Sequence, residues 1–88
     1  MAWTVSFSKT AEKQFNKLDR QLQLAIRNYL RERIAPAADP RQFGKALTAE
    51  LKGLWRYRVS DYRIICEIQD QRLMVLVVKI GHRGDVYR

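Results

Sequence analysis

Three β-prone runs follow one another in the last third of the chain, and this pattern constrains the fold more than any other feature. The runs cover residues 54–59, 62–68 and 73–80. Short polar segments, residues 60–61 and 69–72, separate them, and both are typical of hairpin turns. The third run is apolar at consecutive positions, which predicts a strand inside the sheet that is covered on both faces. The sequence therefore predicts a three-stranded antiparallel meander.

The first half of the chain predicts a strand followed by two helices. Residues 3–7 alternate between apolar and polar side chains, as in a half-buried strand. Ser8 and Asp19 are good N-cap residues, and apolar side chains recur at helical spacing after each of them. The second helix should end at Ala35, because a proline follows it. Residues 36–53 then read as a loop.

The predicted fold class is α+β. The N-terminal strand and two-helix hairpin precede the three-stranded antiparallel meander, and the helices pack on one face of a small, mostly antiparallel sheet. The chain has 88 residues, too few for a doubly wound nucleotide-binding fold or a second domain. We therefore expect one domain covering residues 1–88.

The charge of the chain favours a polyanionic partner. Lys and Arg number 17 against 9 Asp and Glu, a net charge of +8, and 11 of the 17 are Arg. Arginine pairs bidentately with phosphate and keeps its charge. The partner would be nucleic acid or an acidic protein. The alternative is a well-solvated surface whose charge only favours solubility.

Cysteine usage and hydropathy point to the cytoplasm. The single cysteine, Cys66, cannot form an internal disulfide, and its apolar surroundings predict a buried, unreactive thiol. The N-terminus lacks the pattern of a signal peptide. The longest apolar stretch, residues 73–78, is too short to span a bilayer. We expect no membrane partner and no disulfide.

The first two strands of the meander carry arginines on one face. Strand alternation points Arg56 and Arg58 away from Trp55, Tyr57 and Val59. A two-residue turn at 60–61 would place Arg58 opposite Arg63 and Arg56 opposite Ile65. Like charges directly opposite each other destabilise a strand pair by about 0.2–1 kcal/mol. Such a face is either fully solvated or made to hold an anion.

The C-terminal segment carries further polar side chains. Residues 80–88 contain the only histidine, His82, together with Arg83, Tyr87 and Arg88. Gly81 and Gly84 would let this segment bend back over the arginine-bearing face. A lone histidine is more often structural or exposed than catalytic, and a terminal tyrosine is more often a packing residue.

Taken together, two segments resemble a known family. Residues 54–64 read Leu-Trp-Arg-Tyr-Arg-Val-Ser-Asp-Tyr-Arg-Ile, and residues 80–87 read Ile-Gly-His-Arg-Gly-Asp-Val-Tyr. They are similar to the RelE toxins of bacterial and archaeal toxin–antitoxin pairs, within the RelE/ParE superfamily and its microbial ribonuclease-like fold. The resemblance covers nearly the whole chain. It implies an endoribonuclease that cuts messenger RNA in the ribosomal A site without metal or cofactor, so that translation and growth stop. A cognate RelB-like antitoxin would hold it inactive.

The resemblance also implies site residues. Arg56 and Arg58 match the family's paired basic residues, and Arg63 matches its phosphate-stabilising arginine. Arg83 matches the arginine on the leaving-group side, and Tyr87 the tyrosine that stacks on the RNA. We expect Arg63 and Tyr87 to be exposed on the open face of the sheet.

The general base is not assigned by the resemblance. The best-known members carry lysines where this chain has Arg56 and Arg58, and an arginine is a poor base. His82 is one candidate, a ribosomal group is another, and a carboxylate such as Glu67 or Asp85 is a third.

Other basic residues are expected to contact RNA or the ribosome. They are Lys52, Arg56, Arg58, Arg88, Lys9, Lys13, Arg27 and Arg31. We expect the antitoxin to supply an acidic segment that covers the basic face or displaces the C-terminal segment.

Two other functions remain open. A ParE-type relative would poison DNA gyrase without cleaving RNA, although such toxins generally lack the arginine and tyrosine set. A basic module would bind RNA or the ribosome without cutting. Codon-phased cleavage of messenger RNA is expected of the endoribonuclease and of neither alternative.

Overall fold

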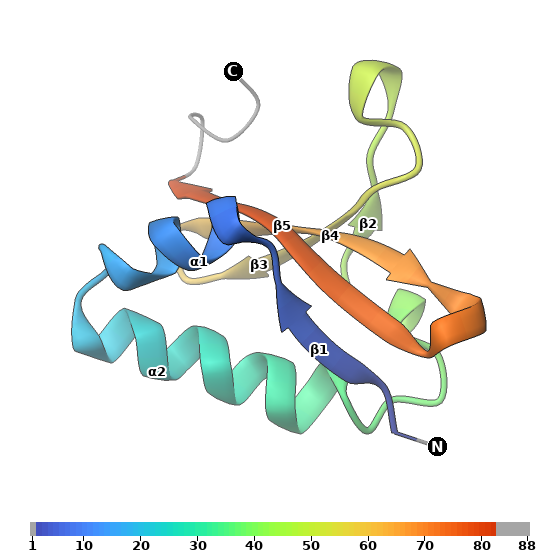
Figure 1. The fold of residues 1–88 in the computed structure, drawn as a ribbon, viewed down its shortest axis with the longest axis horizontal. Coiled ribbons are helices and arrows are strands. Elements are labelled where there is room, and N and C mark those ends of the chain that lie inside the picture. Colours follow the sequence, from blue (N-terminus) through green and yellow to red (C-terminus); the bar gives the residue numbers. More distant parts are fainter. Residues whose placement is uncertain (1, 83–88) are drawn as a thin grey trace.

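The structure is a computed structural model that describes residues 2–82. It confirms the predicted α+β order of a strand, two helices and a three-stranded meander, with helices on one face of a mostly antiparallel sheet (Figure 1). The regular elements are β1 (Thr4–Phe7), α1 (Lys9–Asn16), α2 (Arg20–Tyr29), β2 (Lys45–Ala46), β3 (Trp55–Val59), β4 (Tyr62–Gln69) and β5 (Met74–His82).

The sheet contains one strand more than predicted, and one unpredicted pairing. The strand order is β1-β5-β4-β3-β2. β1 runs parallel to β5, whereas the other neighbours are antiparallel. β2 has only two residues, too few to show strand alternation. In this strand order β4 is the middle strand of the sheet.

Both helices begin at the predicted caps. The Ser8 hydroxyl accepts the amide of Ala11 at 3.1 Å, and the Asp19 carboxylate accepts the amide of Leu22 at 2.8 Å. The Ser8 hydroxyl also donates to the carbonyl of Val78, which fastens α1 to β5. α2 continues as a turn of π-helix over Leu30–Ile34 and ends before the proline, as expected.

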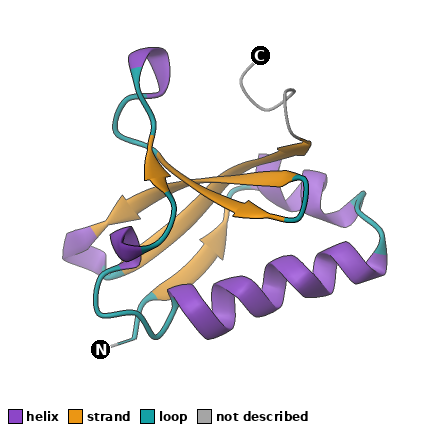
Figure 2. Cartoon of the chain, turned by 180° about the vertical axis from the view of Figure 1, so that it is seen from behind, coloured by secondary structure: helices purple, strands orange, loops and turns teal. Residues whose placement is uncertain are grey.

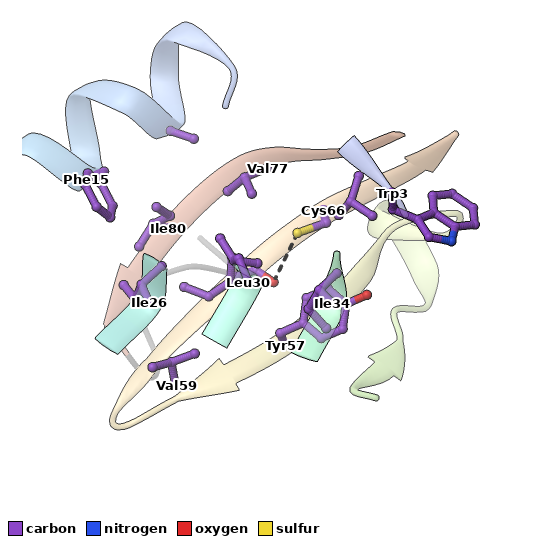
Figure 3. Packing of buried hydrophobic residues seen from close by; sticks show 13 residues of the cluster. Trp3, Phe15, Ile26, Leu30, Ile34, Tyr57, Val59, Cys66, Val77 and Ile80 are labelled. Atoms are coloured by element: carbon purple, nitrogen blue, oxygen red, sulfur yellow. Dashed lines mark hydrogen bonds between the residues drawn. The ribbon is translucent and has the colours of Figure 1, made fainter. Parts of the chain in front are cut away.

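The hydrophobic core lies between the helices and one face of the sheet (Figure 3). Ile26, Leu30 and Ile34 come from α2 and its π-helical turn, and Tyr57 and Val59 come from β3. Each fully buried aliphatic side chain stabilises the fold by about 1.5–3 kcal/mol. This packing fixes the side of the sheet on which the remaining side chains of β3 and β4 must lie.

Cys66 is part of the core and has no exposed surface. Burial raises the pKa of its thiol well above the ordinary value. The predicted burial of this thiol is confirmed.

The prediction that the last strand is covered on both faces is only half right. Val75 and Val77 are fully buried beneath the helices. Leu76 and Val78, on the alternate positions, are half-buried. No helix covers that second face in residues 2–82 (Figure 2).

The segment predicted as a loop, residues 36–53, is held by side chains of β3 and of the turn between β4 and β5. The Tyr57 hydroxyl donates to the carbonyl of Pro40 at 2.8 Å, and the Trp55 indole donates to the carbonyl of Phe43. The Arg41 guanidinium binds both carboxylate oxygens of Asp70, at 2.9 and 2.7 Å. Beyond β2, the segment rises on the side of the sheet opposite α2 (Figure 1).

None of the helices in residues 2–82 has the length and apolar character that a membrane crossing requires.

Candidate nucleic-acid interface

A pair of arginines faces away from the core at the β3–β4 turn. The register places Arg58 opposite Arg63 and Val59 opposite Tyr62, as the two-residue turn predicted. Val59 belongs to the core, so its neighbour Arg58 points to the other face. Two guanidinium groups therefore share one row of the face that is left uncovered by the helices of residues 2–82.

A second row of basic side chains lies beside this pair. Arg56 stands opposite Ile65, as predicted, and the same row continues to Lys45 on β2 and to Lys79 on β5. Sequence reasoning missed both lysines. Lys45 lies in a two-residue strand that has no pattern of its own. Lys79 had a visible signal, because it is the only charged residue in the run 73–80.

We call these residues the basic face: Arg58 and Arg63 in the first row, and Lys45, Arg56 and Lys79 in the second.

Arg63 is more buried than expected. Its residue is 8% exposed, whereas Arg58 is exposed and Arg56 is intermediate. The expectation that Arg63 is exposed was wrong, and the physical reason is its place on the middle strand. It lies between Arg58 on one side and Gly81 on the other. Because burial restricts a guanidinium to fewer conformations, it loses less conformational entropy when it binds an anion than an exposed one does.

A small hollow of about 30 Å³ opens beside the arginine pair. Its lining consists of Arg58, Ser60, Asp61 and Arg63. This volume is on the scale of one bound water or one oxygen of an anion. Asp61 is therefore the carboxylate that the structure brings to the arginines, and sequence reasoning did not select it.

The carboxylate that sequence reasoning did name within the described residues lies farther away. Glu67 is four residues along β4 from Arg63, a distance of about 13 Å along an extended strand. Asp85 lies outside the described residues.

His82 is exposed at the end of β5, at the same end of the sheet as the hollow. It pairs with Tyr62 across the strands, and their ring centroids are 5.3 Å apart in an edge-on arrangement. Arg83, Tyr87 and Arg88 lie outside the described residues, so their predicted roles stay predictions.

The basic residues of the helices lie apart from the basic face. Lys9 and Lys13 are exposed on α1, and Lys52 is exposed on the segment that rises from the sheet. Arg27 and Arg31 line a larger cavity of about 600 Å³, and the Arg27 guanidinium lies 5.6 Å from the centre of the Phe15 ring.

This larger cavity, the β1 groove, was not predicted. It runs between β1, α1 and α2, and its apolar lining includes Val5, Phe7, Phe15 and Leu30. β1 stands at the edge of the sheet, so one side of its backbone faces no other strand of residues 2–82. An edge strand beside an apolar groove is a typical docking place for an extended peptide.

Residues 2–82 contain no group of three or more His, Cys, Asp or Glu side chains arranged to hold a metal ion. The chemistry available at the arginine pair is that of positive charges beside the Asp61 carboxylate. Such a site stabilises an anion or a developing negative charge on a phosphate.

Comparison with known proteins identifies the family. Residues 5–87 match the family described as the ParE toxin of the type II toxin–antitoxin system parDE. The chain belongs to this family.

Two of the relatives are toxins by name. Toxin RelG of Mycobacterium tuberculosis is 31% identical over 88 residues, which cover 100% of this chain and 99% of that protein. Toxin RelE of the same organism is 28% identical over 85 residues, 96% of this chain and 84% of that protein. The chain is therefore a RelE-like toxin of a type II toxin–antitoxin system.

Solved structures of the same type share its fold. The toxin–antitoxin complex RelBE2 of Mycobacterium tuberculosis contains a chain that is 28% identical, with a TM-score of 0.85 over 97% of this chain and 95% of that chain. The isolated RelE toxin of Escherichia coli is 19% identical, with a TM-score of 0.74 over 94% of this chain and 86% of that chain. The second likeness concerns the fold alone.

Proposed function

We propose that this toxin is a metal-independent endoribonuclease that cleaves messenger RNA in the ribosomal A site. The single observation that supports this most is the register of Arg58 opposite Arg63 beside a shared hollow. Two fixed guanidinium groups that repel each other are stabilised when a phosphate lies between them. Cleavage would stop translation and growth, and the site of action would be the cytoplasm.

In the proposed reaction the RNA attacks its own phosphate, assisted by side chains of the protein. The ribose 2′-oxygen attacks the adjacent phosphorus, and the bond from phosphorus to the departing 5′-oxygen breaks. Arg58 and Arg63 stabilise the additional negative charge on the phosphate oxygens. The resemblance assigns protonation of the 5′-oxygen to the side of Arg83, and orientation of the RNA to Tyr87.

The proton acceptor is the step that the sequence left open. Asp61 lines the hollow with both arginines, whereas Glu67 lies about 13 Å along β4 from Arg63. Asp61 is therefore our candidate for the group that takes the 2′-hydroxyl proton, with His82 as the other residue at this end of the sheet. A positioned general base accelerates proton transfer about 10²- to 10⁴-fold.

A RelB-like antitoxin is the proposed protein partner. The related RelBE2 structure is a toxin–antitoxin complex. Two surfaces of this chain suit a segment of such a partner. The basic face suits an acidic segment, and the β1 groove suits an extended one. Hydrogen exchange on the complex would distinguish them, because protection of the Arg58–Arg63 turn favours the first surface and protection of β1 the second.

The test of the nuclease is primer extension on messenger RNA from a translating extract to which the toxin has been added. The proposal expects cuts phased with codons, and expects Arg58→Ala to abolish them. Arg20→Ala is the matched control, because it removes the same charge from the first turn of α2. Equal loss of cleavage in both variants, or cuts without codon phase, would contradict the proposal.

The alternatives make different predictions in the same extract. A DNA gyrase poison leaves messenger RNA intact and accumulates cleaved supercoiled DNA. A basic module that only binds RNA or the ribosome arrests translation with uncut messenger RNA. Ribosomal RNA would then be its main ligand.

A further inference from the structure

The second row of the basic face has the composition of a phosphate site, and the reaction proposed above gives its residues no step. Arg56 and Lys79 flank Ile65, one on each neighbouring strand. Ile65 is 1% exposed but does not belong to the core cluster beneath the helices. Long basic side chains can lay their aliphatic stems over such an apolar residue and keep their charged ends in water.

The spacing of the rows matches a nucleic-acid backbone. Arg58 and Arg56 are two residues apart on β3, so the rows lie about 6.6–6.8 Å apart. This distance is close to that between consecutive phosphates of an extended nucleotide chain. Within the second row, Arg56 and Lys79 are two strands apart, about 9.5 Å between their backbones. Their side chains can therefore converge on one phosphate above Ile65.

We propose that Arg56 and Lys79 form a second phosphate site, which binds the phosphodiester next to the one held by Arg58 and Arg63. Lys45, opposite Arg56 on β2, stands at the outer end of the same row. This inference rests on the proposed RNA substrate. It adds a residue, Lys79, that neither the resemblance nor the arginine pattern selects.

The experiment uses two deoxynucleotides that cannot be cleaved, TpT with one phosphodiester and TpTpT with two. Their affinities for the full toxin are measured by NMR titration at low salt. With one site alone, the ratio of the affinities of TpTpT and TpT is about 2, because either phosphate of TpTpT can occupy the site. With two sites this affinity ratio is about 5 to 10. We expect the larger ratio for the wild type and about 2-fold for Lys79→Gln. Lys79→Arg should restore it.

The matched control is Lys17→Gln, which removes the same charge from an exposed position at the end of α1. This variant should keep the wild-type ratio. The salt dependence gives a second readout, because one phosphate contact on a single strand contributes about 0.7 to the slope of log K against log salt. Lys79→Gln should lower the TpTpT slope by about that amount and leave the TpT slope unchanged.

Several outcomes would overturn the inference. An equal fall of the ratio in Lys17→Gln would show that net charge alone is responsible. The absence of saturable shifts with TpTpT would remove the site altogether. If Lys79→Gln does not fold, the wild-type titration still decides, because TpTpT but not TpT should shift the amides of Ile65 and Lys79.

Two further measurements distinguish the second phosphate site from a site for an acidic protein and from the nuclease proposal. Tighter binding of a triglutamate peptide than of TpTpT, with the same dependence on Lys79, would assign the row to an acidic protein partner. Failure of the nuclease proposal is read independently, from the absence of codon-phased cuts in the extract. The deoxynucleotide titration does not depend on that result.

Discussion

Gly44 supports the edge of the basic face, and Gly44→Ala tests how tightly that edge is built. Its φ is +72°, a left-handed conformation that costs an ordinary L-residue about 1–2 kcal/mol. A Cβ here would lie 2.2 Å from the carbonyl oxygen of Arg56, 2.9 Å from the Tyr57 ring and 3.0 Å from the Trp55 indole nitrogen. The backbone of β2 must therefore move away from β3.

The cost of Gly44→Ala follows from these contacts. Overpacking against a fixed backbone costs about 1–3 kcal/mol. The expected loss of unfolding free energy is about 2–5 kcal/mol when the backbone penalty is added. The pairing of Lys45 with Arg56 should loosen at the same time, so the second row of the basic face should lose order.

Gly53→Ala is the matched control for this prediction. Gly53 also has a positive φ, +96°, but a Cβ there would meet nothing within 4 Å. It should therefore cost only the backbone penalty, about 1 kcal/mol once the reduced entropy of the unfolded chain is counted. Urea unfolding of both variants measures the difference. Equal losses would refute the argument that Gly44 is needed for the close approach of β2 and β3.

Three further predictions concern single side chains. Asp70→Asn should destabilise the protein at pH 7, because hydrogen bonding to Arg41 lowers the pKa of the Asp70 carboxyl. That stabilisation is present above the unfolded pKa of about 3.9 and is lost as the pH falls through the lower folded value. The urea midpoints of wild type and variant should therefore converge as the solution is acidified. Asp61→Asn should reduce codon-phased cleavage about 10²- to 10⁴-fold in the primer-extension assay, whereas Glu67→Gln should leave it intact. Cys66 should resist a thiol reagent in native buffer and react fully in urea, because burial raises the pKa of its thiol; rapid native labelling would contradict that placement.

The register of the arginine pair could be predicted because local chemistry determines it. A two-residue turn leaves one pairing for the residues beside it, so Arg58 must face Arg63. The helix starts are equally local, since Ser8 and Asp19 cap their own first turns.

Other features depend on partners far along the chain. The sequence of residues 4–7 does not predict that β1 pairs with β5, and the two residues Lys45 and Ala46 are too few to predict a strand. The burial of Arg63 follows from the strands on both sides of it, which alternation within β4 cannot show. The hollow that joins Asp61 to the arginines likewise exists only after the turn has formed.

The parallel pairing of β1 with β5 makes assembly of this toxin a late event in its synthesis. Val5 pairs with Val75, so β1 cannot join the sheet until β5 has been synthesised and has left the ribosome. Contacts of such long sequence separation also slow folding, because the intervening chain must be closed into a loop. A nascent chain that lacks β5 has no partner for β1 and no Lys79. The β1 edge of the sheet therefore forms only after β5 has been made.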